Sequence, residues 1–128
     1  MPALERLTGV RVVAAPADID AWVAILDPST VVIRPAPDDA FAIDVSSAQV
    51  DDSHAIVEDE RGFVGGWSTL DGLRRHLEWT PPTDRPTLAQ GSIAGVPGKL
   101  WIVDDEHVLV VAAAAHADVL GERLRWTR

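Results

Sequence analysis

Residues 102–110 read IVDDEHVLV, two short apolar runs on either side of a charged and polar stretch. Such runs around a polar turn are typical of two antiparallel strands in a hairpin. Residues 56–64 read IVEDERGFV and match this stretch without a gap, with five of the nine positions identical. Beyond each stretch an amphipathic segment ends in a tryptophan, Trp79 in the first case and Trp126 in the second. The pattern indicates an internal repeat of hairpin, helix and closing tryptophan.

We therefore predict that residues of about 54–79 and 99–126 are two copies of one hairpin-then-helix unit, with the turn of the first hairpin at 59–61. A hairpin with one helix cannot bury its apolar face alone, so two copies would pack together and complete a sheet covered by helices. The alternative is that any two acidic hairpins followed by amphipathic helices look alike. The predicted fold class is α+β, mostly antiparallel sheet with three to four helices, built from two ferredoxin-like units.

The segments around the repeat complete this prediction. A β-branched run at 11–15 predicts a strand, and apolar residues at helical spacing within 17–26 predict a helix. Residues 31–45 contain two extended runs around a proline-containing turn and predict another hairpin. Glycine and proline at 95–98 predict a turn just before the second copy.

Length, charge and the absence of cysteine limit the classes of protein. The chain has 128 residues, the size of one domain, so we predict a single domain over residues 1–128. Its 20 acidic and 11 basic side chains leave a net charge of −9, which disfavours nucleic acid and anionic membrane surfaces as partners. Without cysteine there is no disulfide framework and no thiolate chemistry. No apolar stretch reaches the ~20 residues that a membrane span needs, and the N-terminal charges do not fit a signal peptide. We expect a cytoplasmic protein with no membrane partner.

The side chains that usually carry chemistry form no known motif. The four histidines lack the spacing of a zinc site, and the acidic turns lack the calcium-loop pattern. No serine lies in a nucleophile-elbow motif, and residues 91–98, GSIAGVPG, match no phosphate-binding loop. We therefore predict no catalytic residue, no metal site and no cofactor.

Tryptophan is the most unusual feature of the composition, because the chain has five tryptophans and no tyrosine. An indole offers a large contact area at a low cost in side-chain entropy, so tryptophan is enriched at interfaces. The candidate interface residues are Trp67, Trp79, Trp101 and Trp126. Packing of the same side chains in the core is the alternative.

Residues 100–110, LWIVDDEHVLV, resemble the LWLGPDEWLLL motif in the gamma subunit of heterotetrameric sarcosine oxidase. The matching residues are Leu100, Trp101, Asp105, Glu106 and Leu109. The chain departs from the motif where the family has Gly-Pro and a second tryptophan. The resemblance covers about residues 70–126. It implies a fold related to the T-protein of the glycine cleavage system and a small non-catalytic subunit, with flavin and folate chemistry in other subunits.

Two functions follow from these observations. The first is a non-catalytic binding or assembly module that binds a partner protein or associates with itself. A small accessory subunit of an oxidoreductase complex, as the resemblance implies, is one form of such a module. The second is a small ligand-binding domain or enzyme with a pocket between the two repeat halves. In that case Asp44, Glu58 or Asp105 would serve as acid or base.

Overall fold

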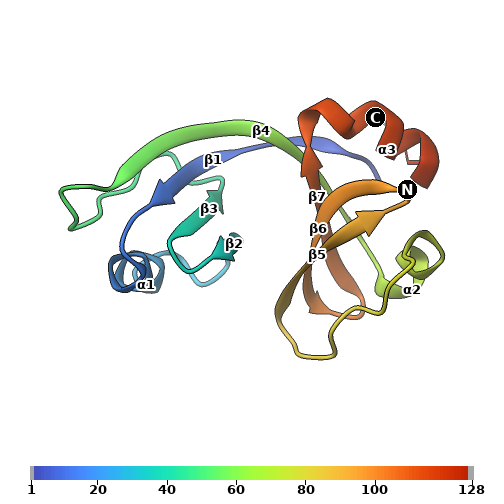
Figure 1. Cartoon of the computed structure of the whole chain (residues 1–128), viewed down its shortest axis with the longest axis horizontal. Coiled ribbons are helices and arrows are strands. Elements are labelled where there is room, and N and C mark those ends of the chain that lie inside the picture. Colours follow the sequence, from blue (N-terminus) through green and yellow to red (C-terminus); the bar gives the residue numbers. More distant parts are fainter. Residues whose placement is uncertain (1, 127–128) are drawn as a thin grey trace. The chain divides into compact units, whose positions relative to one another are not determined.

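The computed structural model describes residues 2–126, which contain seven β-strands, three α-helices and two 3-10 turns (Figure 1). The strands are β1 (Glu5–Val13), β2 (Val32–Ala36), β3 (Asp39–Ile43), β4 (Ile56–Ser68), β5 (Thr87–Ile93), β6 (Val96–Asp104) and β7 (His107–Ala113). The helices are α1 (Pro16–Ala24), α2 (Leu70–Leu73) and α3 (Ala117–Leu124), with 3-10 turns η1 (Arg74–His76) and η2 (Ala114–His116). None of the helices between residues 2 and 126 is long and apolar enough to cross a membrane.

Contacts divide the chain into two compact units. Unit 2 contains Leu7–Arg61, and unit 1 contains the stretch before Leu7 together with the stretch from Gly62 onward. The borders fall inside β1 and β4, so each of these two long strands has residues in both units. The proline-rich stretch that follows Trp79 lies wholly within unit 1.

In unit 2, a β2–β3 hairpin and β1 form an antiparallel sheet with α1 beside it. This confirms the hairpin predicted within 31–45. Pro16 opens α1 at its first helical position, where the missing N–H costs no hydrogen bond. Ile19 and Trp22 of α1 are buried in one cluster with Val10 and Val12 of β1. The helical spacing of the apolar residues therefore corresponds to a buried helix face.

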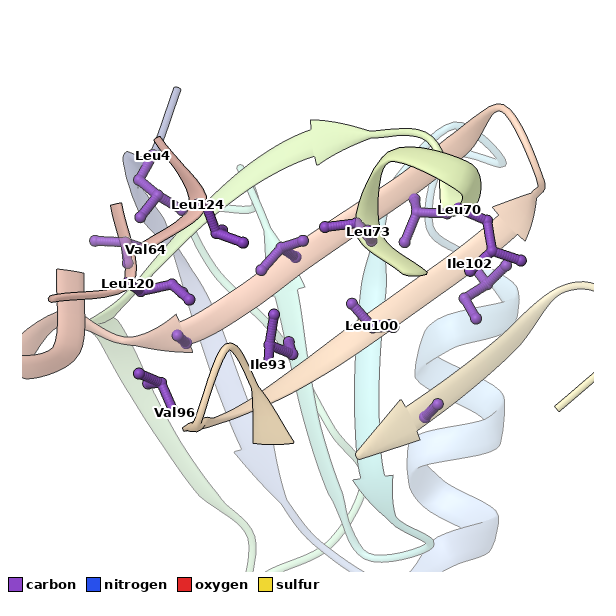
Figure 2. Packing of buried hydrophobic residues seen from close by; sticks show 14 residues of the cluster. Leu4, Val64, Leu70, Leu73, Ile93, Val96, Leu100, Ile102, Leu120 and Leu124 are labelled. Atoms are coloured by element: carbon purple, nitrogen blue, oxygen red, sulfur yellow. The ribbon is translucent and has the colours of Figure 1, made fainter. Parts of the chain in front are cut away.

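In unit 1, β4, β7, β6 and β5 follow one another in an antiparallel sheet. One face carries the larger core, in which Leu100 lies opposite Val110 and Ala89 in the neighbouring strands. Figure 2 shows Leu70 and Leu73 of α2 on this face of the sheet. The described part of α3 adds further apolar side chains to the same cluster. All of the core-facing positions alternate with positions on the opposite face, as strand geometry requires.

The first predicted hairpin is wrong, because residues 56–68 form the single strand β4. The predicted turn at 59–61 lies inside that strand. There, Glu60 approaches Arg11 of β1 at 3.8 Å, and Arg11 also forms an ion pair with Asp39. A strand can point charged side chains to solvent, so a charged stretch does not by itself require a turn.

The predicted fold class is therefore wrong in its repeating unit. The described residues are 45% strand and 22% helix, and their three α-helices are short. Only the second copy contains a hairpin, β6–β7, followed by a helix, α3. In the first copy a continuous strand is followed by α2, which has four residues and is capped by the Thr69 side chain accepting from the Gly72 N–H at 3.0 Å. Residues 2–126 therefore do not contain two ferredoxin-like copies.

The turn between β5 and β6 also differs from its prediction. It contains Ala94 and Gly95, both with positive φ values, of 51° and 78°. This geometry matches a two-residue hairpin turn whose twist suits the flanking strands. Pro97 and Gly98 lie within β6. The pairing of β6 with β7 begins at Lys99, so Pro97, which has no N–H to donate, lies before the paired residues.

Candidate functional site

Two of the four candidate interface tryptophans lie on the sheet face opposite the core of unit 1. Trp67 of β4 and Trp101 of β6 are both paired with Leu109 of β7, and Leu88 of β5 is paired with Trp101. Residues paired in this way point to the same side of a sheet, so the four side chains form one row across it. Trp67 has an exposed fraction of 47%, and Trp101 is half-buried.

Trp79 and Trp126 have a different environment, because both pack against the core of unit 1. A Cβ on Gly91 would lie 2.7 Å from the Trp79 ring, and a Cβ on Gly66 would lie 2.7 Å from the Trp126 ring. Each indole therefore occupies space that only glycine leaves free. The Trp79 ring nitrogen also donates to the Ser92 carbonyl at 2.7 Å. The interface role of the four tryptophans stays a prediction, and these two have a structural role as well.

Replacing Trp79 by phenylalanine is expected to lower the free energy of unfolding by about 1 kcal/mol, since the ring contact remains and one hydrogen bond is lost. Urea denaturation measures this change. Trp79→Ala should cost clearly more, because it also leaves the space above Gly91 empty. A Trp79→Phe protein as unstable as Trp79→Ala would contradict a contact made mainly by ring packing.

A groove of about 340 Å³ lies on unit 1, and we call it the Lys99 groove. Most of its lining residues are neighbours in adjacent strands. One row across the sheet contains Gln90, Lys99 and Val111, and the pairs Ser92–Pro97 and Phe63–Ala113 lie beside it. The remaining lining residues are Gly91, Gly98, Ala112 and His116. Strand alternation places Gln90, Lys99 and Phe63 on the face opposite the core.

The groove has an unusual charge for this chain. None of the described residues that line it is acidic, although the chain has 20 carboxylates. Lys99, the only lysine of the chain, has its ammonium 5.6 Å from the centre of the Phe63 ring, within the range of a cation–π contact. Gln90, Ser92 and His116 add side chains that can donate hydrogen bonds. A groove with these donors and one cation suits an anionic group.

The two units differ strongly in charge. Unit 2 has three basic and eleven acidic residues, a net charge of −8. Unit 1 has eight basic and nine acidic residues, a net charge of −1. The acidity of the whole chain therefore describes unit 2 and not the sheet that carries the Lys99 groove.

The three carboxylates proposed as acid or base do not form one site. Asp44 lines a polar hollow of about 400 Å³ in unit 2, together with Asp59 and Arg61. Glu58 is exposed on β4 and does not line that hollow. Asp105 lies in the β6–β7 turn of unit 1, where it pairs with Arg85 at 3.0 Å. All three side chains are exposed to solvent.

Several side chains have shifted pKa values. Hydrogen bonds from the Ala15 and His54 N–H groups lower the pKa of Asp52, and the hydrogen bond with His107 lowers the pKa of Asp104. Burial and the charge of Arg75 lower the pKa of His76. Between residues 2 and 126, no three histidine or carboxylate side chains are grouped to hold a metal ion.

No protein-family model and no curated protein matches the chain. Residues 100–110, which carry the resemblance to the sarcosine oxidase gamma subunit, form β6, its tight turn and most of β7.

Sequence reasoning did not find this groove. Its main lining residues come from three different strands, and only the register of the sheet brings them together. They are Lys99, Gln90, Ser92 and Phe63. One signal was present in the sequence: between Leu88 and Ile93, polar Gln90 and Ser92 alternate with small or apolar residues. That alternation marks one polar strand face, but it says nothing about which residues lie across from it.

Proposed function

We propose that the chain is a non-catalytic binding module whose Lys99 groove binds an anionic group of a partner. The observation that carries the proposal is the set of lining residues. Those within 2–126 join one cation to polar and aromatic side chains and include no carboxylate. An accessory subunit of an oxidoreductase complex, as the sarcosine oxidase resemblance implies, would be one module of this kind.

The composition of the groove supports binding of a group with both charge and apolar surface. Phe63 and Pro97 offer apolar contact at the same level of the sheet as Ser92. Lys99 is only partly exposed, and its ammonium lies 5.6 Å from the centre of the Phe63 ring. A carboxylate attached to an apolar body matches both parts.

Lys99→Glu is expected to weaken binding of benzoate, an aromatic carboxylate, at least about tenfold, because it replaces an attractive charge by a repulsive one. Amide NMR titration of the whole chain measures the affinity and locates the site. In the unchanged protein, benzoate should shift the amides of Gln90, Ser92 and Lys99.

Arg74→Glu is the matched control. It makes the same change of charge in unit 1, at an exposed residue that does not line the groove. It should leave the affinity for benzoate nearly unchanged. Equal losses in the two variants would show that benzoate responds only to overall charge, and shifts confined to other residues would place the anion elsewhere. Either result would contradict the proposed function.

A further inference from the structure

The edge of β5 offers backbone hydrogen-bonding groups beside the Lys99 groove. In the unit-1 sheet, β5 has β6 on one side and no strand on the other. The two-residue turn makes Ile93 and Val96 a hydrogen-bonded pair, and such pairs alternate along an antiparallel ladder. Ala89, Gly91 and Ile93 therefore bond to β6, whereas the N–H and C=O groups of Leu88, Gln90 and Ser92 point away from it.

Part of this edge is already occupied. The Ser92 carbonyl accepts from the Trp79 ring nitrogen at 2.7 Å, and the Ala94 N–H donates to the His76 carbonyl at 2.7 Å. The bond to the Ser92 carbonyl agrees with the conclusion that this carbonyl points away from β6. Among the described residues, no partner is recorded for the outward backbone groups of Leu88 and Gln90.

The edge also lacks the features that protect free strand edges. Residues 87–93, TLAQGSI, contain no charged residue, no proline and no irregular register with β6. The outer strand of unit 2, β2, contains Arg34 and Pro35 and has an irregular register between Ile33 and Ala36. Charge, proline and bulges are the usual means of preventing strand addition. One outer strand is protected against addition, and β5 is not.

We infer that an extended acidic segment of a partner protein adds to β5 as an antiparallel strand and places a carboxylate at the Lys99 groove. The inference rests on the proposed function and adds to it the class of partner and the mode of binding. A residue opposite Gln90 would have its side chain on the groove face. Its backbone would lie two strand spacings, about 10 Å, from the backbone of Lys99. A glutamate and a lysine side chain together can span that distance when the Lys99 ammonium turns from the Phe63 ring of β4 toward β5.

The same geometry predicts the residues next to that glutamate. Strand side chains alternate, so its neighbours in the segment would lie on the core face, level with Ala89 and Gly91. Trp79 lies over Gly91 on that face. An apolar side chain would contact the indole there. The expected segment therefore alternates acidic and apolar residues.

A second copy of this chain is a poorer occupant of the same edge. Pairing of β5 with another β5 would bring no carboxylate to the groove, because residues 87–93 contain none. An acidic strand from a different protein satisfies both the free backbone groups and Lys99.

The test uses the whole chain and the peptide acetyl-Val-Glu-Val-Glu-Val-amide, with affinity measured by calorimetry. Glutamates opposite Gln90 would have their own N–H groups bonded to β5, whereas the valine N–H groups would point away. N-methylation of both glutamates should weaken binding at least about tenfold, and N-methylation of the central valine should not. Replacing both glutamates by glutamine should weaken binding as much as Lys99→Glu does.

Gln90→Pro tests the same bond from the side of the protein, since it removes an outward N–H and leaves the bonds to β6 in place. This variant should lose the peptide. Leu88→Pro removes the neighbouring outward N–H at a residue that does not line the groove, so this second variant should lose the peptide and keep benzoate. The N-methylated peptides answer the question even if Gln90→Pro does not fold, because they use the unchanged protein.

The outcomes separate the two proposals. Equal binding of the two N-methylated peptides would overturn strand addition and leave the proposed function standing if benzoate still binds at Lys99. If the unchanged protein binds neither benzoate nor the peptide, both the proposed function and strand addition are overturned. A dimer that Gln90→Pro abolishes, seen by light scattering, would assign the edge to a second copy and overturn the acidic partner.

Discussion

Replacing Leu100 by alanine is expected to lower the free energy of unfolding by about 2–5 kcal/mol, the range for removing a large aliphatic side chain from a packed core. Leu100 has an exposed fraction of 0% and lies in the middle of β6. Ala89 and Val110 flank it in the two neighbouring strands. Figure 2 shows it below Leu73 of α2. Its loss would leave a cavity between the sheet and the helix.

Urea denaturation followed by far-ultraviolet circular dichroism measures this effect. Val103→Ala is the matched control, since Val103 lies in the same strand with an exposed fraction of 40%. It should change the free energy of unfolding by about 0.5 kcal/mol or less. A Leu100→Ala protein with the stability of Val103→Ala would show that this face of the sheet is not the core of unit 1.

Replacing Gly9 by alanine is the second large effect, about 3 kcal/mol or somewhat more of lost stability, at the upper end for overpacking. A Cβ at this position would lie 2.0 Å from the Ala42 carbonyl oxygen of β3 and 2.9 Å from the Phe41 ring. The carbonyl belongs to the backbone of the paired strand, so it cannot move away as a side chain could. The β1–β3 pairing in unit 2 would have to shift.

The same denaturation experiment tests this prediction, with Thr8→Ala as control. Thr8 is the adjacent residue of β1 and is exposed. Removing its hydroxyl and methyl groups should change stability by about 0.5 kcal/mol or less. Similar stability of Gly9→Ala and the unchanged protein would contradict the close approach of β3 to Gly9.

Local patterns predicted several elements correctly because the forces behind them are local. The apolar spacing within 17–26 predicted α1, and the two extended runs within 31–45 predicted the β2–β3 hairpin. In each case the periodicity of the residues, or a proline in the turn, is sufficient evidence. The hairpin β6–β7 followed in the same way from the polar turn at 104–107.

The prediction for residues 56–64 failed because two similar sequences can pair with different strands of the sheet. The stretches 56–64 and 102–110 share five of nine residues, yet the second turns back at Asp104 and the first continues. In the first stretch, Glu60 meets Arg11, a residue 49 positions earlier in the chain. Long-range pairing of this kind leaves no periodic signal in a single sequence.

The sequence by itself determined the size of the chain, its charge, its lack of cysteine and the elements set by local periodicity. The tertiary structure alone decided that charge is concentrated in unit 2, that β4 is one strand, and that Lys99 meets Phe63 in a groove without carboxylates. The physical reason is the register between strands. It joins residues far apart in the chain, and it depends on the packing of the whole sheet and not on the residues of any one strand.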